Sequence, residues 1–317
     1  MNNDIQEMLT EPDNWQWGEF QNRNNQHIRY GWNCPPNAKA LIVFAEGRTE
    51  VIEEYFENIR YFNERGYACA IMDWQGQGLS YRLTGDNSRH HSIGFEQDIS
   101  DFDEFMACLA TIDGFKALPK VLVAHSMGAN ITLRYLADHQ DIFKCGVMVA
   151  PMLGLNPKRT IKLFGKMLLN MAAKLNWHSK YALGQTAWNE KIAHVAKFKV
   201  SSCPMRRDLQ PYLFKTKPEL QSGGVTWGWL AEALKSIATL HDAETCERIK
   251  TPLYFAIAQN DIVVDNAGTI KTISLLPNAT QKIYEKAEHQ IHREQDAIRL
   301  PLLSEMKKFI EKSLRFS

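Results

Sequence analysis

The feature that most constrains this chain is a regular alternation of short apolar runs with longer helical stretches. The apolar runs of the first half are short enough to be buried strands, and each ends at a turn signal or a helix start: 40–46, 67–73, 120–125 and 145–150. Helix-like stretches lie between them, at about 52–65, 95–112 and 127–139. This pattern is typical of a parallel sheet covered by helices on both faces. The sequence therefore predicts an α/β fold.

The alternation stops between about 152 and 248 and then resumes. That interval contains a helix-length run, KRTIKLFGKMLLNMAAKLNW, and a Trp-bearing stretch, GGVTWGWLAEALKS. Strand-like runs follow at 252–259 and 281–287, with a final helix near 293–315. We therefore predict a core made of 1–151 and 249–317. Residues 152–248 would form an inserted helical cap over the C-terminal edge of the sheet, where open parallel sheets bind ligands.

Composition excludes several classes of protein. The 317 residues include 37 basic and 36 acidic ones, so the basic excess of a nucleic-acid binder is missing and no nucleic-acid partner is expected. The first thirty residues lack the basic start and apolar core of a signal peptide, and no run approaches the roughly 20 apolar residues of a membrane-spanning helix. We expect a cytoplasmic protein, with contact at the inner membrane face left open. The six cysteines form no C-x-x-C pair, so we expect no metal and no cofactor.

The stretch VLVAHSMGAN, at 121–130, predicts a nucleophile on a sharp turn. Ser126 follows a strand of small and β-branched residues and precedes an amphipathic helix, which is the context that a nucleophile elbow requires. Its neighbours two positions away must be small, and Ala124 and Gly128 meet that need. The alternative is a serine that only caps the following helix.

A nucleophilic serine needs a histidine base held by a carboxylate, here in the chain order Ser, acid, His. Asp261 lies just beyond the apolar run 252–259, with Asp265 as its rival. His289 lies beyond the next strand, with His292 as its rival. We predict Asp261 and His289, because they lie nearer the strand ends and so nearer to Ser126.

The oxyanion of an acyl-transfer reaction needs two backbone N–H donors. One is expected from Met127, directly after the serine at the helix N-terminus. The other is expected from Arg48 in the loop AEGRTE, where Gly47 allows the backbone to turn. Gly47 could equally serve the turn alone.

Five motifs together resemble the α/β-hydrolase superfamily, in its monoacylglycerol lipase and lysophospholipase branch: VFAEGRTE, IMDWQGQGLS, VLVAHSMGAN, QNDIVVDN and EKAEHQIH. The GR-x-E loop, the alanine before His125 and the run APMLGL are similar to bacterial lysophospholipases of the L2 type. The resemblance implies an α/β-hydrolase fold, a serine–aspartate–histidine triad at the positions chosen above, and the same two oxyanion amides. The branch usually has His-Gly where this chain has Glu46-Gly47, and we expect Glu46 to alter one wall of the site entrance.

The first helical run of the predicted cap has two unlike faces. Lysines and an asparagine share one side, and apolar residues share the other. Either this is an ordinary cap helix, or its apolar side lines an acyl channel while the lysines approach an anionic lipid surface. Trp227 could belong to the same wall or to the core. The candidate substrate-binding residues are Phe164, Met167, Leu168, Met171 and Trp227.

The Arg48 side chain offers two further interpretations. It could meet a phosphate group, which would favour a lysophospholipid over a neutral monoglyceride. An ion pair with Glu46 or Glu50 is the more ordinary expectation.

The whole pattern predicts a serine hydrolase that cleaves carboxylic esters of single-chain lipids, with a lysophospholipase as the first choice. A monoacylglycerol lipase or a broad carboxylesterase is the alternative within enzymes. A binding module that kept the fold without catalysis is the alternative from another class.

Overall fold

Strands from both halves of the chain form one sheet. The computed structural model describes residues 2–156, 159–190 and 200–315, and within them eight strands lie in the order β1-β2-β4-β3-β5-β6-β7-β8. The strands are β1 Gln16–Gln21, β2 His27–Asn33, β3 Leu41–Ala45, β4 Ala68–Met72, β5 Lys120–His125, β6 Cys145–Val149, β7 Leu253–Ala258 and β8 Ala279–Tyr284. Strands β1, β2 and β4 pair antiparallel, and every pair from β4 through β3 to β8 is parallel.

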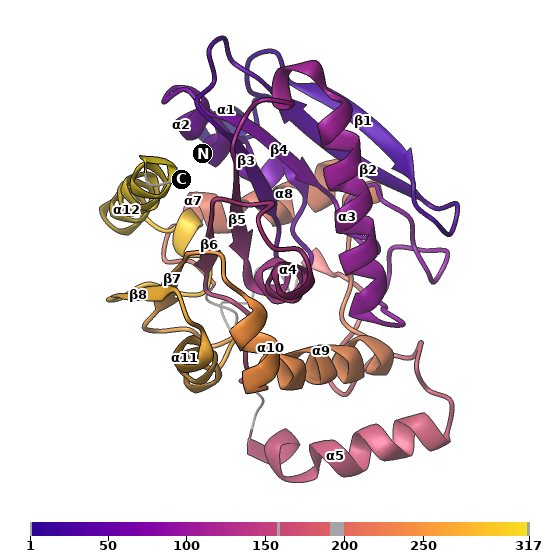
Figure 1. The fold of residues 1–317 in the computed structure, drawn as a ribbon. Helices are drawn as coiled ribbons and strands as arrows, with labels where there is room; N and C mark the ends of the chain where they lie inside the picture. Colours follow the sequence, from indigo (N-terminus) through magenta and orange to yellow (C-terminus); the bar gives the residue numbers. More distant parts are fainter. Residues whose placement is uncertain (1, 157–158, 191–199, 316–317) are drawn as a thin grey trace.

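Helices cover both faces of this sheet (Figure 1). The bounds of the α-helices are α1 Asn2–Met8, α2 Phe56–Asn63, α3 Phe95–Thr111, α4 Ser126–Asp138, α5 Arg159–Lys174, α7 Pro204–Arg207, α8 Leu209–Thr216, α9 Trp227–Thr239, α10 Ala243–Arg248, α11 Asn266–Leu275 and α12 Asp296–Arg315. The short 3₁₀ helices are η1 Ile52–Tyr55, η2 Asp113–Phe115, η3 Pro218–Leu220 and η4 Ile291–Arg293.

The period-2 alternation of each central strand divides the core into two layers. In β3, for example, Val43 packs with α3 and α4, whereas Phe44 packs with α2 and α12 on the opposite face. All five residues of β3, β4 and β6 are buried, as expected for parallel strands covered on both sides. The predicted α/β fold with a mostly parallel sheet is therefore confirmed.

Between β6 and β7, the described residues contribute helices and no strand of the sheet. Helix α5 lies beside α9 at the end of the molecule farthest from α1 and α2 (Figure 1). Helix α10, at the end of the predicted cap, packs on α4 and α11 and so lies in the helix layer of the sheet. Among the described helices, none combines the length and apolar character that crossing a membrane requires.

Candidate active site

The predicted elbow is a sharp strand-to-helix turn. Strand β5 ends at His125, and Ser126 begins α4 with a φ of 50°, a backbone conformation that non-glycine residues adopt only where the surroundings impose it. Gly128 lies so close to the end of β3 that a Cβ atom there would come 2.5 Å from the Ala45 carbonyl oxygen. Ala124, by contrast, is a buried strand residue. The turn holds the Ser126 hydroxyl at the C-terminal edge of the sheet.

The structure brings Ser126, His289 and Asp261 together in one hydrogen-bonded chain. His289 Nε2 lies 2.9 Å from Ser126 Oγ, and His289 Nδ1 lies 2.7 Å from Asp261 Oδ2. The other carboxylate oxygen, Asp261 Oδ1, accepts the backbone N–H groups of Val263 and Val264 at 2.8 and 2.9 Å. The three side chains have the arrangement in which a histidine can remove a serine proton.

The environment of Asp261 favours its ionised form. Burial alone would raise the pKa of this carboxyl group, but the neighbouring His289 and the two amide hydrogen bonds outweigh burial, so the pKa lies below its ordinary value. An ionised Asp261 can orient the imidazole of His289 and stabilise its protonated form.

The two rival residues lie outside this chain of hydrogen bonds. The Asp265 side chain accepts the Ala267 N–H at 3.0 Å and caps helix α11. His292 stacks on Tyr55 with ring centroids 5.4 Å apart and also packs on His125. The structure therefore places Asp261 and His289, rather than Asp265 and His292, next to Ser126.

The loop after β3 is fixed by three hydrogen bonds with the side chains of Glu50 and Gln77. Gly47 donates its N–H to Glu50 Oε2 at 2.6 Å, and Gln77 Nε2 donates to the Gly47 carbonyl at 2.9 Å. Gln77 Oε1 accepts the Thr49 N–H at 2.9 Å, whereas the Arg48 N–H between them has no acceptor among the described residues. Glycine is needed at 47 because a Cβ atom there would lie 2.6 Å from His125 Nδ1, and the positive φ falls on Thr49 instead. A rigid loop with one free N–H suits an oxyanion donor.

Glu50 connects this loop to the rest of the site, a role that sequence reasoning missed. Its carboxylate also accepts from Tyr55 Oη at 2.6 Å and Gln290 Nε2 at 2.9 Å, and lies 3.0 Å from His125 Nδ1. His125 Nε2 in turn lies 3.3 Å from the His289 carbonyl oxygen. The sequence offered Glu50 only as the last letter of the GR-x-E motif and as a candidate ion-pair partner of Arg48, with no indication of these distant partners.

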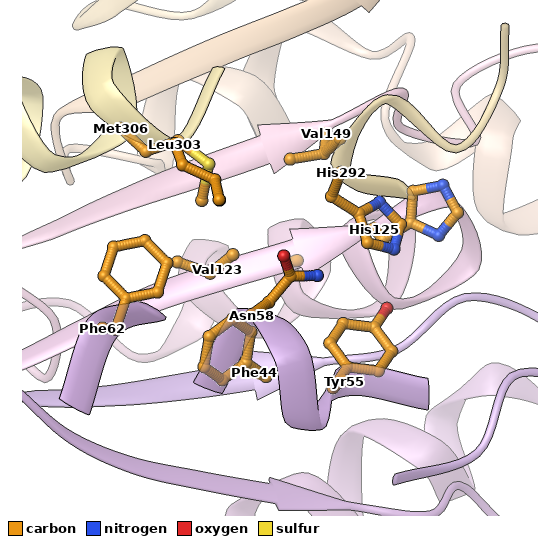
Figure 2. Close-up of a pocket in the computed structure, with 11 residues that line it drawn as sticks. Phe44, Tyr55, Asn58, Phe62, Val123, His125, Val149, His292, Leu303 and Met306 are labelled. Atoms are coloured by element: carbon orange, nitrogen blue, oxygen red, sulfur yellow. The ribbon is translucent and has the colours of Figure 1, made fainter. Parts of the chain in front are cut away.

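A cavity of about 10 Å³, roughly the space of one water molecule, lies behind the site. Figure 2 shows His125 and His292 side by side at one end of it, near Tyr55, with apolar side chains such as Phe62 and Leu303 toward the other end. Among the described residues, Glu50, His125 and His292 could in principle hold a metal, with ligand atoms within 4.8 Å of one another. The Glu50 oxygens are already engaged by hydrogen-bond donors, so we interpret this group as a buried polar network.

Two expectations for the loop are corrected. Glu46 is fully buried, with Oε1 bonded to Gln77 Nε2 at 2.5 Å, so it does not form a wall of the site entrance. The expected ion pair of Arg48 with Glu46 or Glu50 is not formed, and no other described carboxylate replaces it. The Arg48 guanidinium instead lies over the ring of Trp229 at 5.7 Å.

The candidate substrate-binding residues of the cap have different surroundings. Met167 and Met171 are 60% and 42% exposed, whereas Leu168 packs against the core beside α9. Trp227 is buried in the same core. The side chain of Phe164 lies outside the described residues. Their role in substrate binding stays a prediction.

The mostly parallel sheet, the sharp turn at Ser126 and the hydrogen-bonded chain at its C-terminal edge define the class of the protein as an α/β-hydrolase. The chain belongs to the hydrolase family Hydrolase_4, whose model carries the description "Serine aminopeptidase, S33" and matches residues 36–296. This membership confirms the predicted superfamily.

Relatives support the same branch. The chain is 25% identical to a probable lysophospholipase L2 of Haemophilus influenzae, covering 86% of this chain and 84% of the relative. It is 26% identical to lysophospholipase L2 of Escherichia coli K12, covering 82% and 76%. Its fold resembles a soluble variant of monoglyceride lipase from Saccharomyces cerevisiae in complex with a substrate analog, with a TM-score of 0.76, 96% of each chain covered and 17% identity.

Proposed function

We propose that this hydrolase cleaves carboxylic esters of single-chain lipids by a serine mechanism, and that lysophospholipids are its substrates. The observation that carries the proposal is the hydrogen-bonded chain from Asp261 through His289 to Ser126. The similarity to two lysophospholipases L2 supports the choice of lysophospholipid. Residues 152–248 would form the cap over this site.

In the proposed reaction, His289 accepts the Ser126 proton as Oγ attacks the ester carbonyl carbon. Asp261 holds the imidazole in the correct tautomer and stabilises its charged form. The N–H groups of Met127 and Arg48 bind the oxyanion of the tetrahedral intermediate. His289 then protonates the leaving glycerol oxygen, and the headgroup alcohol departs. Water, activated by the same histidine, hydrolyses the acyl-enzyme and releases the fatty acid.

The proposal is tested with the Ser126→Ala variant. We expect kcat on a 1-acyl lysophosphatidylcholine to fall about 10⁴-fold or more, because the covalent step loses its nucleophile. Ser274→Ala, at an exposed serine of α11, is the matched control and should keep the wild-type kcat. Labelling by a fluorophosphonate probe should disappear in Ser126→Ala only. A wild-type protein that neither labels nor cleaves any ester would instead be a non-catalytic binding module.

The choice of substrate is tested separately. Lysophosphatidylcholine, a 1-monoacylglycerol of equal chain length and a short p-nitrophenyl ester are compared by kcat/KM, together with an amino-acid p-nitroanilide because the family description names an aminopeptidase. A preference for the monoacylglycerol would make the protein a monoacylglycerol lipase, and equal rates on all three esters a broad carboxylesterase.

A further inference from the structure

Three buried nitrogen atoms that have no hydrogen-bond partner in the described part of the chain belong to side chains that pack together beside the oxyanion loop. They are Arg48 Nη1, Trp229 Nε1 and His90 Nδ1. Arg48 Cζ lies 5.7 Å from the centre of the Trp229 ring, and the His90 and Trp229 ring centroids are 5.9 Å apart. Trp229 and His90 are 4% and 2% exposed. Buried polar atoms in native proteins nearly always have partners, so three unpaired nitrogens in one cluster indicate an absent acceptor.

All three nitrogens can donate a hydrogen bond, His90 when Nδ1 carries its proton. We propose that Arg48, Trp229 and His90 bind the phosphate group of the lysophospholipid substrate. The inference rests on the proposed function and adds to it the residues that distinguish a phospholipid from a neutral glyceride.

The charges around the cluster favour an anion. Burial lowers the pKa of Arg48 to about 10, which leaves it charged at neutral pH without a described carboxylate to balance it. Among the described residues, the nearby Arg82 hydrogen-bonds only to carbonyl oxygens, those of Gly78 at 2.6 Å and Gln221 at 3.3 Å among them. Glu46, in the same loop as Arg48, is buried, and its raised pKa favours the neutral form. A partly buried cation without a counter-charge is costly, and a phosphate would offset that cost with charge-assisted hydrogen bonds.

The position of the cluster fits the covalent structure of the substrate. The Arg48 N–H is a proposed oxyanion donor, so the arginine side chain starts at the reacting carbonyl. In a 1-acyl lysophospholipid, the same number of covalent bonds separates the carbonyl carbon from phosphorus as separates the arginine amide nitrogen from its guanidinium carbon. Arg48 is partly exposed and therefore reachable. His90 pairs with Val225 of the predicted cap, so the other side of the cluster is built where loop and cap meet.

The test measures a ratio of substrates. For the wild type, Arg48→Met, Arg48→Lys and Trp229→Phe, kcat/KM is determined on lysophosphatidylcholine and on a 1-monoacylglycerol of the same chain length. We expect Arg48→Met to lower the ratio of lysophosphatidylcholine to monoacylglycerol activity by about tenfold to a hundredfold, the effect of losing a hydrogen bond to a charged group. Arg48→Lys should restore part of the ratio because it keeps the charge. Trp229→Phe, which keeps an aromatic ring but removes the N–H donor, should lower the ratio severalfold.

Arg23→Gln, at an exposed arginine paired with Glu104, is the control and should leave the ratio unchanged. If Arg48→Met lowers both activities equally, Arg48 acts only through the oxyanion loop and the inference is wrong.

Binding of sn-glycerol 3-phosphate, measured by calorimetry beside glycerol and inorganic phosphate, separates the inference from the proposed function. Saturable binding of the phosphoester that is lost in Arg48→Met supports the site even if the wild type hydrolyses no lipid ester. Inorganic phosphate that binds as well as the phosphoester would show a general anion site and overturn the assignment to a lipid headgroup. Absence of phosphoester binding in the wild type would also overturn it.

Discussion

The residues two positions before and after Ser126, Ala124 and Gly128, are small for different physical reasons. The Ser126 backbone is held at a φ of 50°, and a Cβ atom at Gly128 would lie 2.4 Å from the Glu46 carbonyl oxygen. Backbone atoms cannot move away as a flexible side chain can, so a methyl group at 128 must displace the elbow. Ala124 lies earlier, inside β5, where its methyl group packs in the core. The alanine in place of the usual glycine is therefore compatible with a working turn.

We expect Gly128→Ala to cost about 1–3 kcal/mol of unfolding free energy, as overpacking does, and to lower esterase kcat because Ser126 shifts relative to His289. Ala124→Gly should cost only about 0.5–1 kcal/mol, from backbone entropy in a strand, and leave kcat near the wild-type value. Urea unfolding and the rate on a short p-nitrophenyl ester measure both effects. Equal behaviour of the two variants would contradict this account of the elbow.

Glu46 makes the stability depend on pH in an unusual direction. Burial raises the pKa of its carboxyl group well above the ordinary value of 4.5, and the nearby Asp73 raises it further, while the hydrogen bond from Gln77 opposes both. A raised pKa in the folded state means that folded Glu46 holds a proton that unfolded Glu46 has lost. Its contribution to stability is therefore present below pH 4.5 and is lost as the pH rises toward the raised pKa.

The Glu46→Gln variant keeps the shape without the titration. We expect the wild type to lose stability relative to this variant as the pH rises above 4.5, by about 1.4 kcal/mol for each unit of pH over which only the folded state is protonated. Urea unfolding midpoints at several pH values measure the difference. Glu285→Gln, at an exposed strand-end residue, is the control, and its unfolding midpoint should change with pH as that of the wild type does. If the midpoint of Glu46→Gln changed with pH in the same way as that of the wild type, Glu46 would be ionised in the folded state.

At the scale of elements, the buried strands and the edge strand β8 could be predicted, whereas β1 and β2 could not. The runs at 40–46, 67–73, 120–125, 145–150 and 252–259 match β3 to β7 within a residue at either end. Strands β1 and β2 lie toward an open edge; β1 has only exposed and partly exposed residues and β2 mixes exposed with buried ones, so neither forms an apolar run. Strand β8 begins two residues before the predicted run at 281, because four of its six residues are exposed. Burial on both faces fixes the bounds of a strand in the sequence, whereas exposure blurs those bounds in β8 and leaves no apolar run in β1 and β2.

Helix α9 begins at a threonine cap, Thr226. The buried Thr226 Oγ1 accepts the Trp229 N–H at 3.2 Å and lies 2.7 Å from His91 Nδ1. Thr226→Val keeps the volume but leaves both groups unpaired, so we expect it to cost about 1–2 kcal/mol. Thr226→Ser keeps the hydroxyl and should cost less than about 1 kcal/mol.

Thr239→Val, at a partly exposed threonine that ends the same helix, is the matched control and should change stability by less than about 0.5 kcal/mol. Urea unfolding of the three variants gives these differences. A Thr226→Ser variant less stable than Thr226→Val would show that the methyl group, and not the cap, matters at this position.

At the scale of the whole molecule, sequence reasoning identified residues at strand ends but not the contacts between distant segments. Ser126, Asp261 and His289 were predictable because the C-terminal ends of parallel strands meet at one edge. The partners of Glu50 were not, because His125 and Gln290 lie 75 and 240 positions away and carry no periodic signal. The fold alone brings such pairs together, which is why the contacts of Glu50 were missed while the three side chains of the hydrogen-bonded chain were predicted to lie together.

Arg206 illustrates a distant contact that joins the predicted cap to the core. Its guanidinium reaches Glu57 on α2 at 2.7 Å, Asp296 at the start of α12 at 2.8 Å, and the Glu294 carbonyl oxygen at 2.7 Å. Its side chain is 7% exposed, whereas Glu57 and Asp296 are 23% and 60% exposed. Without the arginine, water can still hydrate these partly exposed carboxylates, and Arg299 still lies near both of them. The expected cost of Arg206→Met is therefore about 1–3 kcal/mol, below that of breaking a fully buried pair.

The neighbouring Arg207, more exposed and 3.9 Å from Asp208, provides the control Arg207→Met, which should change stability by less than about 0.5 kcal/mol. The cost of Arg206→Met should also depend on pH. Burial raises the pKa of Glu57, but Arg206 and Arg299 outweigh burial and hold it below its ordinary value, so its contribution is present at neutral pH and is lost as the pH falls through the lowered pKa. The urea unfolding midpoints of Arg206→Met and the wild type should therefore differ at pH 7 and approach each other at pH 3. If the difference between the two midpoints were the same at both pH values, Arg206 would stabilise the fold by packing its aliphatic chain rather than by its ion pairs with Glu57 and Asp296.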